Sequence, residues 1–77
     1  MDDFVKTYEG YCDTLGVGYN ADKYEIKLNY RKLAKKYHPD INKAADATAK
    51  FQEVNNAYDF LSNEQNIERY NRIKNKK

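Results

Sequence analysis

The stretch that decides the fold runs from Asp22 to Asp40 and reads DKYEIKLNYRKLAKKYHPD. Its start is typical of a helix, because Asp22 can cap the backbone and an acidic residue follows three positions later. Apolar residues then recur at intervals of four, three and four, namely Ile26, Tyr30, Leu33 and Tyr37. This spacing predicts one apolar stripe along an α-helix of about 24 Å.

The end of this helix is set by Pro39. A proline disfavours the α conformation of the residue before it and has no backbone N–H to donate, so the helix must stop near His38. An imidazole, a rigid ring and the Asp40 carboxylate are thereby fixed in consecutive positions at a helix terminus. We interpret this tripeptide as a surface device that contacts a partner.

Basic residues are concentrated in the same helix. Residues 22–37 hold six lysines or arginines and two acidic residues, whereas the whole chain has a formal net charge of only +2. Residues 1–21 are acidic on balance. A positive helix in a nearly neutral protein steers association with an acidic partner, whereas the small net charge does not indicate a general polyanion binder.

The length and composition indicate one small globular domain. A chain of 77 residues buries only about 60% of the surface that it exposes when unfolded, so its core must be small. Eight tyrosines dominate an aromatic content of 14%, which supplies bulk for that core and argues against a disordered tail. Three or four helices that share one seam would suffice.

Cys12 is the only cysteine, which excludes an internal disulfide and a cysteine zinc site. No apolar run approaches the roughly 20 residues that cross a bilayer, and the acidic amino terminus lacks a signal-peptide pattern. We expect a cytoplasmic monomer that carries no cofactor and no metal.

A shorter helix is predicted before this stretch. Residues 11–15 have a helical pattern that Gly16 and Gly18 end, since glycine accepts the left-handed dihedral angles of helix ends. Leu15 and Val17 are the expected core anchors. Residues 1–9 are expected to form a flexible lead.

Two further helices are predicted after the loop of residues 38–45. The first begins near Asp46, which we expect to cap it, and carries the apolar stripe Ala47, Phe51, Val54, Tyr58 and Leu61. The last begins at a capping box of Ser62 and Gln65, presents Ile67, Tyr70 and Ile73 on one face, and frays over residues 74–77.

The predicted architecture is all-α. Two long helices form an antiparallel hairpin, with a short helix before and after it. Truncation of Phe51 to alanine would, on this prediction, lower the free energy of unfolding by about 3–5 kcal/mol, because its ring would lie between the long helices.

The sequence resembles the J-domain of DnaJ-type co-chaperones over residues 10–73. The segments that carry this resemblance are Tyr11 to Val17, Glu25-Ile26, Tyr30-Arg31-Lys32-Leu33-Ala34, Tyr37-His38-Pro39-Asp40, Lys50-Phe51, Ala57-Tyr58 and Leu61-Ser62. The tripeptide is weakly specific by itself, but it is highly specific within this framework.

The resemblance implies docking on a DnaK-type chaperone and stimulation of its ATP hydrolysis. It implies that His38, Pro39 and Asp40 are the signal, with the aspartate pairing with a partner arginine. It also implies a docking face on the basic helix, formed by Lys27, Tyr30, Arg31, Lys32 and Lys36. Beside the loop it implies two lesser contributors, Asn42 and Phe51.

Several positions depart from the family pattern. Leu28, Gln52 and the pair Asn66-Ile67 stand where basic residues are common, which bears on affinity or choice of partner. Asn29 stands where a small buried residue is usual, and Cys12 where an aromatic one is, which bears on stability.

Other functions compete with docking as interpretations of these residues. His38 and Asp40 could suggest acid–base catalysis, but the sequence has no nucleophile pattern and no Gly-rich phosphate loop, so we expect neither an enzyme nor catalytic residues. Nucleic-acid binding is disfavoured by the low net charge and by the lack of a helix-turn-helix spacing. A J-like scaffold that binds without stimulating remains an alternative.

Overall fold

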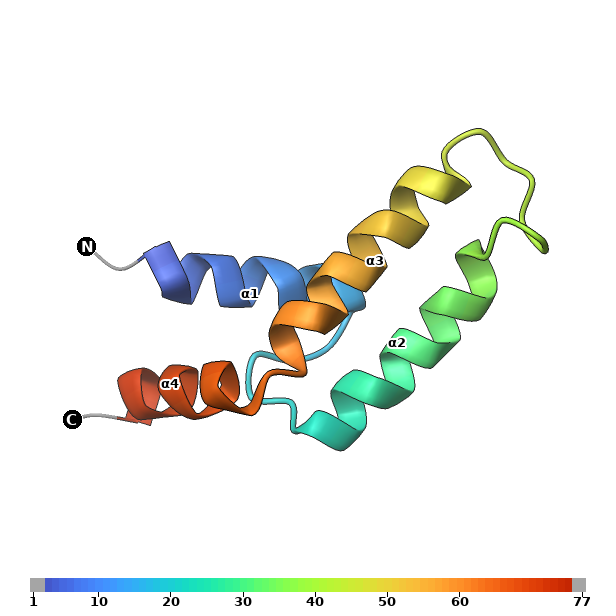
Figure 1. Cartoon of the computed structure of the whole chain (residues 1–77). Coiled ribbons are helices and arrows are strands. Elements are labelled where there is room, and N and C mark those ends of the chain that lie inside the picture. Colours follow the sequence, from blue (N-terminus) through green and yellow to red (C-terminus); the bar gives the residue numbers. More distant parts are fainter. Residues whose placement is uncertain (1–2, 76–77) are drawn as a thin grey trace.

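Four α-helices make up the part of the chain that the computed structural model describes, residues 3–75 (Figure 1). They are α1 (Asp3–Leu15), α2 (Lys23–Tyr37), α3 (Ala47–Leu61) and α4 (Glu64–Asn75). No strand occurs within this range. The predicted all-α class is therefore confirmed.

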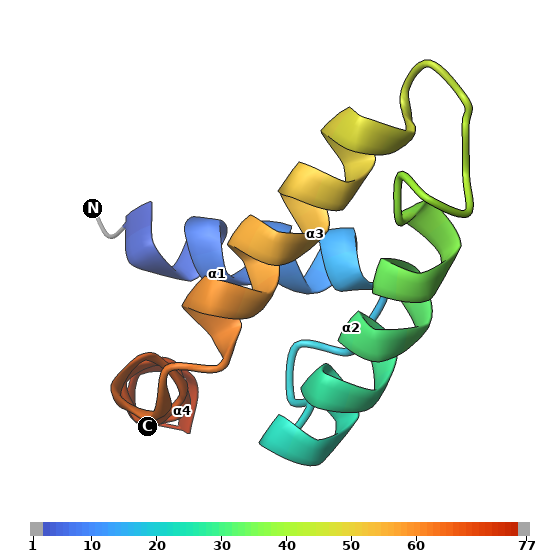
Figure 2. The same ribbon diagram turned by 45° about the vertical axis from the view of Figure 1, so that its right-hand side comes forward.

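Helices α2 and α3 run antiparallel and lie side by side, joined by the loop of residues 38–46 (Figures 1 and 2). Helix α1 crosses α3, and α4 returns toward the end of the molecule at which the described chain begins. The loop thus forms a tip on the opposite end of the molecule from the first and last described residues (Figure 1). The predicted hairpin, with one helix before it and one after it, is confirmed.

The core lies where α1, α2, α3 and α4 meet. Ala57 and Leu61 on α3 are fully buried, and Ile26 on α2 is nearly so. The predicted anchors Leu15 and Val17 are both buried, as expected. The core consists of Tyr8, Cys12, Leu15, Val17, Ala21, Ile26, Val54, Ala57, Leu61 and Tyr70.

Phe51 is not a core residue, contrary to the prediction. Its ring is half-buried and lies outside the core cluster, because the tip of the α2–α3 hairpin extends beyond α1 (Figure 2). The ring instead packs edge-on against the His38 imidazole, with 5.4 Å between the ring centroids. Truncation of Phe51 should therefore cost less than the 3–5 kcal/mol expected of a buried aromatic residue.

Helix α1 begins at Asp3 and is longer than the predicted helix of residues 11–15. Phe4 and Tyr8 continue its apolar face, and Tyr8 stacks on Tyr70 of α4 with 4.1 Å between the ring centroids. This contact stabilises the first part of α1, residues 3–10, which was not predicted to be helical. Residues 1–2 lie outside the described residues, and the flexibility of the lead stays a prediction.

The carboxyl end of α1 is closed by Gly16 and Asn29. Gly16 has a φ of 70°, the left-handed conformation that favours glycine. The Asn29 side-chain amide donates hydrogen bonds to the carbonyls of Leu15 at 3.2 Å and Gly16 at 3.1 Å. Asn29 thus satisfies helix-end carbonyls that would otherwise lack partners, which gives this departure from the family pattern a stabilising role.

The helix starts follow the predictions only in part. Asp22 caps α2 as predicted, since its carboxylate accepts the Glu25 N–H at 2.9 Å. Asp46 precedes α3 but makes no side-chain capping bond. The cap of α4 is Asn63, which accepts the Gln65 N–H at 2.9 Å, whereas the predicted Ser62 ends α3 instead.

Polar contacts join α4 to α1. The Tyr70 hydroxyl donates to the Glu9 carboxylate at 2.5 Å, and the Lys74 ammonium lies 3.5 Å from the same carboxylate. Lys74 and Asn75 are helical, whereas residues 76 and 77 of the predicted fray lie outside the described residues.

None of the helices described here combines the length and the apolar character that crossing a membrane requires. The cytoplasmic location and the monomeric state expected from the sequence stay predictions.

Stability should fall at alkaline pH. Burial, with smaller contributions from Asp13 and Glu9, raises the pKa of the Cys12 thiol from 9.0 to about 11, and burial raises the pKa of Tyr8 to about 12. Above pH 9 the unfolded chain loses protons that the folded chain keeps, so the free energy of unfolding decreases as pH rises toward 12. Urea unfolding followed by circular dichroism from pH 7 to this range would measure the slope.

The matched variant for this measurement is Cys12→Ala. It should have a shallower slope between pH 9 and pH 11, because the thiol whose pKa folding raises over this range is gone. A stability that is independent of pH over this range in the parent chain would contradict the expectation.

Candidate partner-docking surface

The tip loop begins where Pro39 ends α2. His38 has φ −59° and ψ 131°, the extended conformation that a following proline favours. Its carbonyl accepts two backbone N–H groups, from Ile41 at 2.9 Å and from Asn42 at 2.8 Å. The chain therefore folds back on His38 immediately after the helix, and the turn fixes the positions of Pro39 and Asp40.

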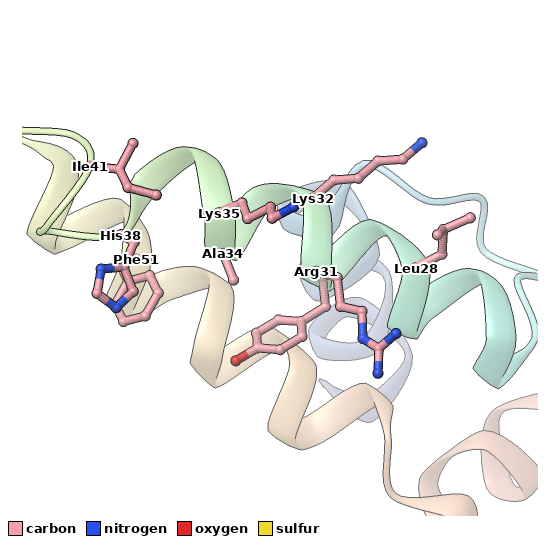
Figure 3. Close-up of a pocket in the computed structure, with 9 residues that line it drawn as sticks. Leu28, Arg31, Lys32, Ala34, Lys35, His38, Ile41 and Phe51 are labelled. Atoms are coloured by element: carbon pink, nitrogen blue, oxygen red, sulfur yellow. The ribbon is translucent and has the colours of Figure 1, made fainter.

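The His38 imidazole is held on two sides. Its Nδ1 accepts the backbone N–H of Asp40 at 3.1 Å, and its ring packs against Phe51 (Figure 3). About half of the imidazole still faces solvent, and the Asp40 carboxylate, 3.8 Å from Nδ1, is 87% exposed. The loop thus positions the ring and leaves the carboxylate accessible to another molecule.

Asn42 braces the loop from within. Its side-chain amide donates to the Lys36 carbonyl at 3.1 Å, and its side-chain oxygen accepts the Ala44 N–H at 3.0 Å. Asn42 therefore ties the loop to the last turn of α2. Asn42 was predicted to contact a partner. In the structure, both its side-chain nitrogen and its side-chain oxygen are engaged in hydrogen bonds within this chain.

A groove of about 530 Å³ runs along α2 and ends at the tip loop. Five of the predicted site residues line it, namely Tyr30, Arg31, Lys32, His38 and Phe51. The remaining five lie outside it, namely Lys27, Lys36, Pro39, Asp40 and Asn42.

Four residues that line the groove were not predicted, namely Leu28, Ala34, Lys35 and Ile41. The sequence contained an indication that Leu28 and Ile41 belong to a surface. Each is a large apolar residue outside the stripes that form the core, and each is more than half exposed.

Tyr30 forms one wall of the groove. Its hydroxyl donates to the Asn55 side-chain oxygen at 2.8 Å, and its ring stacks on Tyr58 with 4.1 Å between the centroids. Tyr30 is half-buried and lines the groove as well, so it belongs both to the helix interface and to the surface.

The groove is cationic. Arg31, Lys32 and Lys35 line it, and the described residues that line it include no carboxylate (Figure 3). Lys27 and Lys36 are exposed on the same helix outside the groove, and Lys36 Nζ lies 5.4 Å from the centre of the Tyr37 ring. All five cations come from α2, which gives this side of the hairpin a positive field.

The chemistry that this surface offers is recognition. It presents cations along α2, the His38 imidazole and one exposed carboxylate at the tip, a pattern suited to charge-assisted contacts with another protein. Within residues 3–75, no group of three His, Cys, Asp or Glu residues is placed to hold a metal ion.

Comparison with known proteins places the chain in a family. Residues 10–71 match the family model of the DnaJ domain. The chain is 60% identical over 63 residues to the chaperone protein DnaJ of Brevibacillus choshinensis, covering 82% of this chain and 17% of the relative. It is 66% identical over 55 residues to the chaperone protein DnaJ of Latilactobacillus sakei, covering 71% and 14%.

The chain thus spans about a sixth of the length of these curated relatives. The match to the family model nevertheless covers most of the chain and includes the whole hairpin with its tip loop. The resemblance found in the sequence is confirmed, and the chain belongs to the DnaJ domain family.

Proposed function

We propose that this chain docks on a DnaK-type chaperone and stimulates its ATP hydrolysis. The observation that carries the proposal is the exposed Asp40 carboxylate, which lies at the tip of the α2–α3 hairpin beside a cationic groove. In this proposal the ATPase chemistry belongs to the partner, and the chain acts as a single copy in the cytoplasm.

Asp40 is the proposed contact that triggers the partner. Its carboxylate is accessible, so it can accept a bidentate, charge-assisted pair of hydrogen bonds from an arginine of the partner. If the contact is desolvated in the complex, its removal should cost several kcal/mol, because the partner's guanidinium would lose its counter-charge. His38 and Pro39 hold the carboxylate in place through the loop.

The basic side of α2 is the proposed guide for docking. Exposed cations raise the rate of encounter with an acidic surface, and they also set the orientation in which the tip arrives. We assign this role to the cations Lys27, Arg31, Lys32, Lys35 and Lys36. Tyr30 and Phe51 support the groove, and Asn42 acts through the shape of the loop.

Asp40→Asn should abolish stimulation without unfolding the chain. The carboxylate is 87% exposed, and the backbone N–H that contacts His38 is retained, so the melting temperature should stay within about 2 °C. In single-turnover assays with a DnaK-type chaperone, stimulation should fall at least about tenfold, since one lost charge-assisted contact exceeds about 1.4 kcal/mol.

The control is Asp46→Asn, which makes the same change at another exposed acidic residue that has no capping bond. It should retain stimulation. Equal stimulation by the parent chain and Asp40→Asn would contradict the proposed role of Asp40. Binding of the parent chain without stimulation would instead identify a scaffold.

Charge reversal on α2 should slow association. Arg31→Glu and Lys32→Glu should each lower the on-rate for the chaperone several-fold at low salt, and the effect should shrink near 0.3 M salt as screening increases. Stopped-flow binding at two salt concentrations would measure it. Lys6→Glu on α1 is the control, since it changes the net charge equally at an exposed site of another helix.

Two results would exclude α2 as the guiding surface. One is an on-rate at low salt that Arg31→Glu and Lys32→Glu leave unchanged. The other is an on-rate that Lys6→Glu lowers as much as they do.

A further inference from the structure

Two exposed apolar side chains mark the ends of the groove. Leu28 is 54% exposed and Ile41 is 69% exposed, yet both line it. Figure 3 shows Ile41 at the His38 end and Leu28 at the opposite end, with the cationic side chains between them. The groove is therefore apolar at both ends and positive along its middle.

Neither side chain is needed for the core. Leu28 lies off the apolar stripe of α2, Ile41 lies in the turn at the tip, and both lie outside the core cluster. A single exposed leucine or isoleucine is ordinary on a protein surface. Two of them in one groove, together with half-buried Ala34 of α2 and Phe51 of α3, form a surface that a partner can desolvate.

The spacing between the two apolar ends can be estimated along the helix. Leu28 precedes His38 by ten residues, which corresponds to about 15 Å along the axis of α2. Ile41 lies beside His38 at the tip (Figure 3). A partner that contacts both ends must therefore present two apolar side chains at about this separation.

We propose that Leu28 and Ile41 determine specificity by each receiving an apolar side chain of the DnaK-type chaperone. Carboxylates of the chaperone would lie between these contacts, opposite Arg31, Lys32 and Lys35. Charge complementarity supports this occupant, because an apolar partner without carboxylates would desolvate three cations that have no counter-charge in the groove. The inference rests on the proposed function and adds a chemical description of the docked surface.

The two kinds of contact have different roles in this proposal. Exposed cation–carboxylate pairs contribute little to affinity and mainly accelerate encounter. Burial of apolar area is insensitive to salt screening and lowers the rate of dissociation. Leu28 and Ile41 therefore retain the chaperone after the cations have guided it.

Leu28→Lys tests this proposal by the sign of its effect. If docking were only electrostatic, the added cation would strengthen binding at low salt. If Leu28 receives an apolar side chain, the affinity should fall about fivefold or more at both low and moderate salt, because the buried apolar area is lost. The dissociation constant for an ATP-bound DnaK-type chaperone would be measured by fluorescence anisotropy at both salt concentrations.

The control is Tyr24→Lys, which adds the same charge one turn earlier at a 77% exposed residue outside the groove. It should bind at least as tightly as the parent chain. Ile41→Lys tests the other end and should behave like Leu28→Lys. Lysine is a good helix former, and circular dichroism would show that Leu28→Lys keeps its helices.

The outcomes separate this inference from the proposed function. Binding by Leu28→Lys that equals or exceeds that of the parent chain, or a loss matched by Tyr24→Lys, would overturn the inference while docking stands. A parent chain that does not bind the chaperone would overturn both.

Discussion

Pro39 imposes the constraint on which the presented surface depends. It holds His38 in an extended conformation at the point where α2 would otherwise continue, which frees the His38 carbonyl to accept the N–H groups of Ile41 and Asn42. The same turn brings the Asp40 N–H to the imidazole. One backbone restriction thereby ends a helix, closes a turn and places an exposed carboxylate at the tip.

The hairpin converts this local constraint into a defined surface. Tyr30 of α2 stacks on Tyr58 and bonds to Asn55, both on α3, so the two helices hold their relative positions near the groove. The core lies at the other end of the hairpin, where α1 and α4 pack (Figures 1 and 2). Stability and recognition are thus separated along the molecule, and changes at the tip should leave the core intact.

The sequence contained enough information for the hairpin but not for all of its surroundings. The stripe of α2, its Asp22 cap and its end at Pro39 follow from local rules, so they were predictable. The start of α1 was not, because Gly10 weakens the helical pattern and the stabilising stack of Tyr8 on Tyr70 joins residues distant in sequence. The groove was missed in part because Leu28 and Ile41 line one surface only after the loop has folded back against the end of α2.

The most direct measurement is backbone amide chemical-shift mapping by NMR of the labelled chain during titration with an ATP-bound DnaK-type chaperone. We predict that the perturbed amides lie on α2, in residues 38–42 and beside Phe51, whereas those of α1 and α4 stay unchanged. Perturbations concentrated on α1 and α4, or none at saturating chaperone, would contradict docking through the tip of the hairpin.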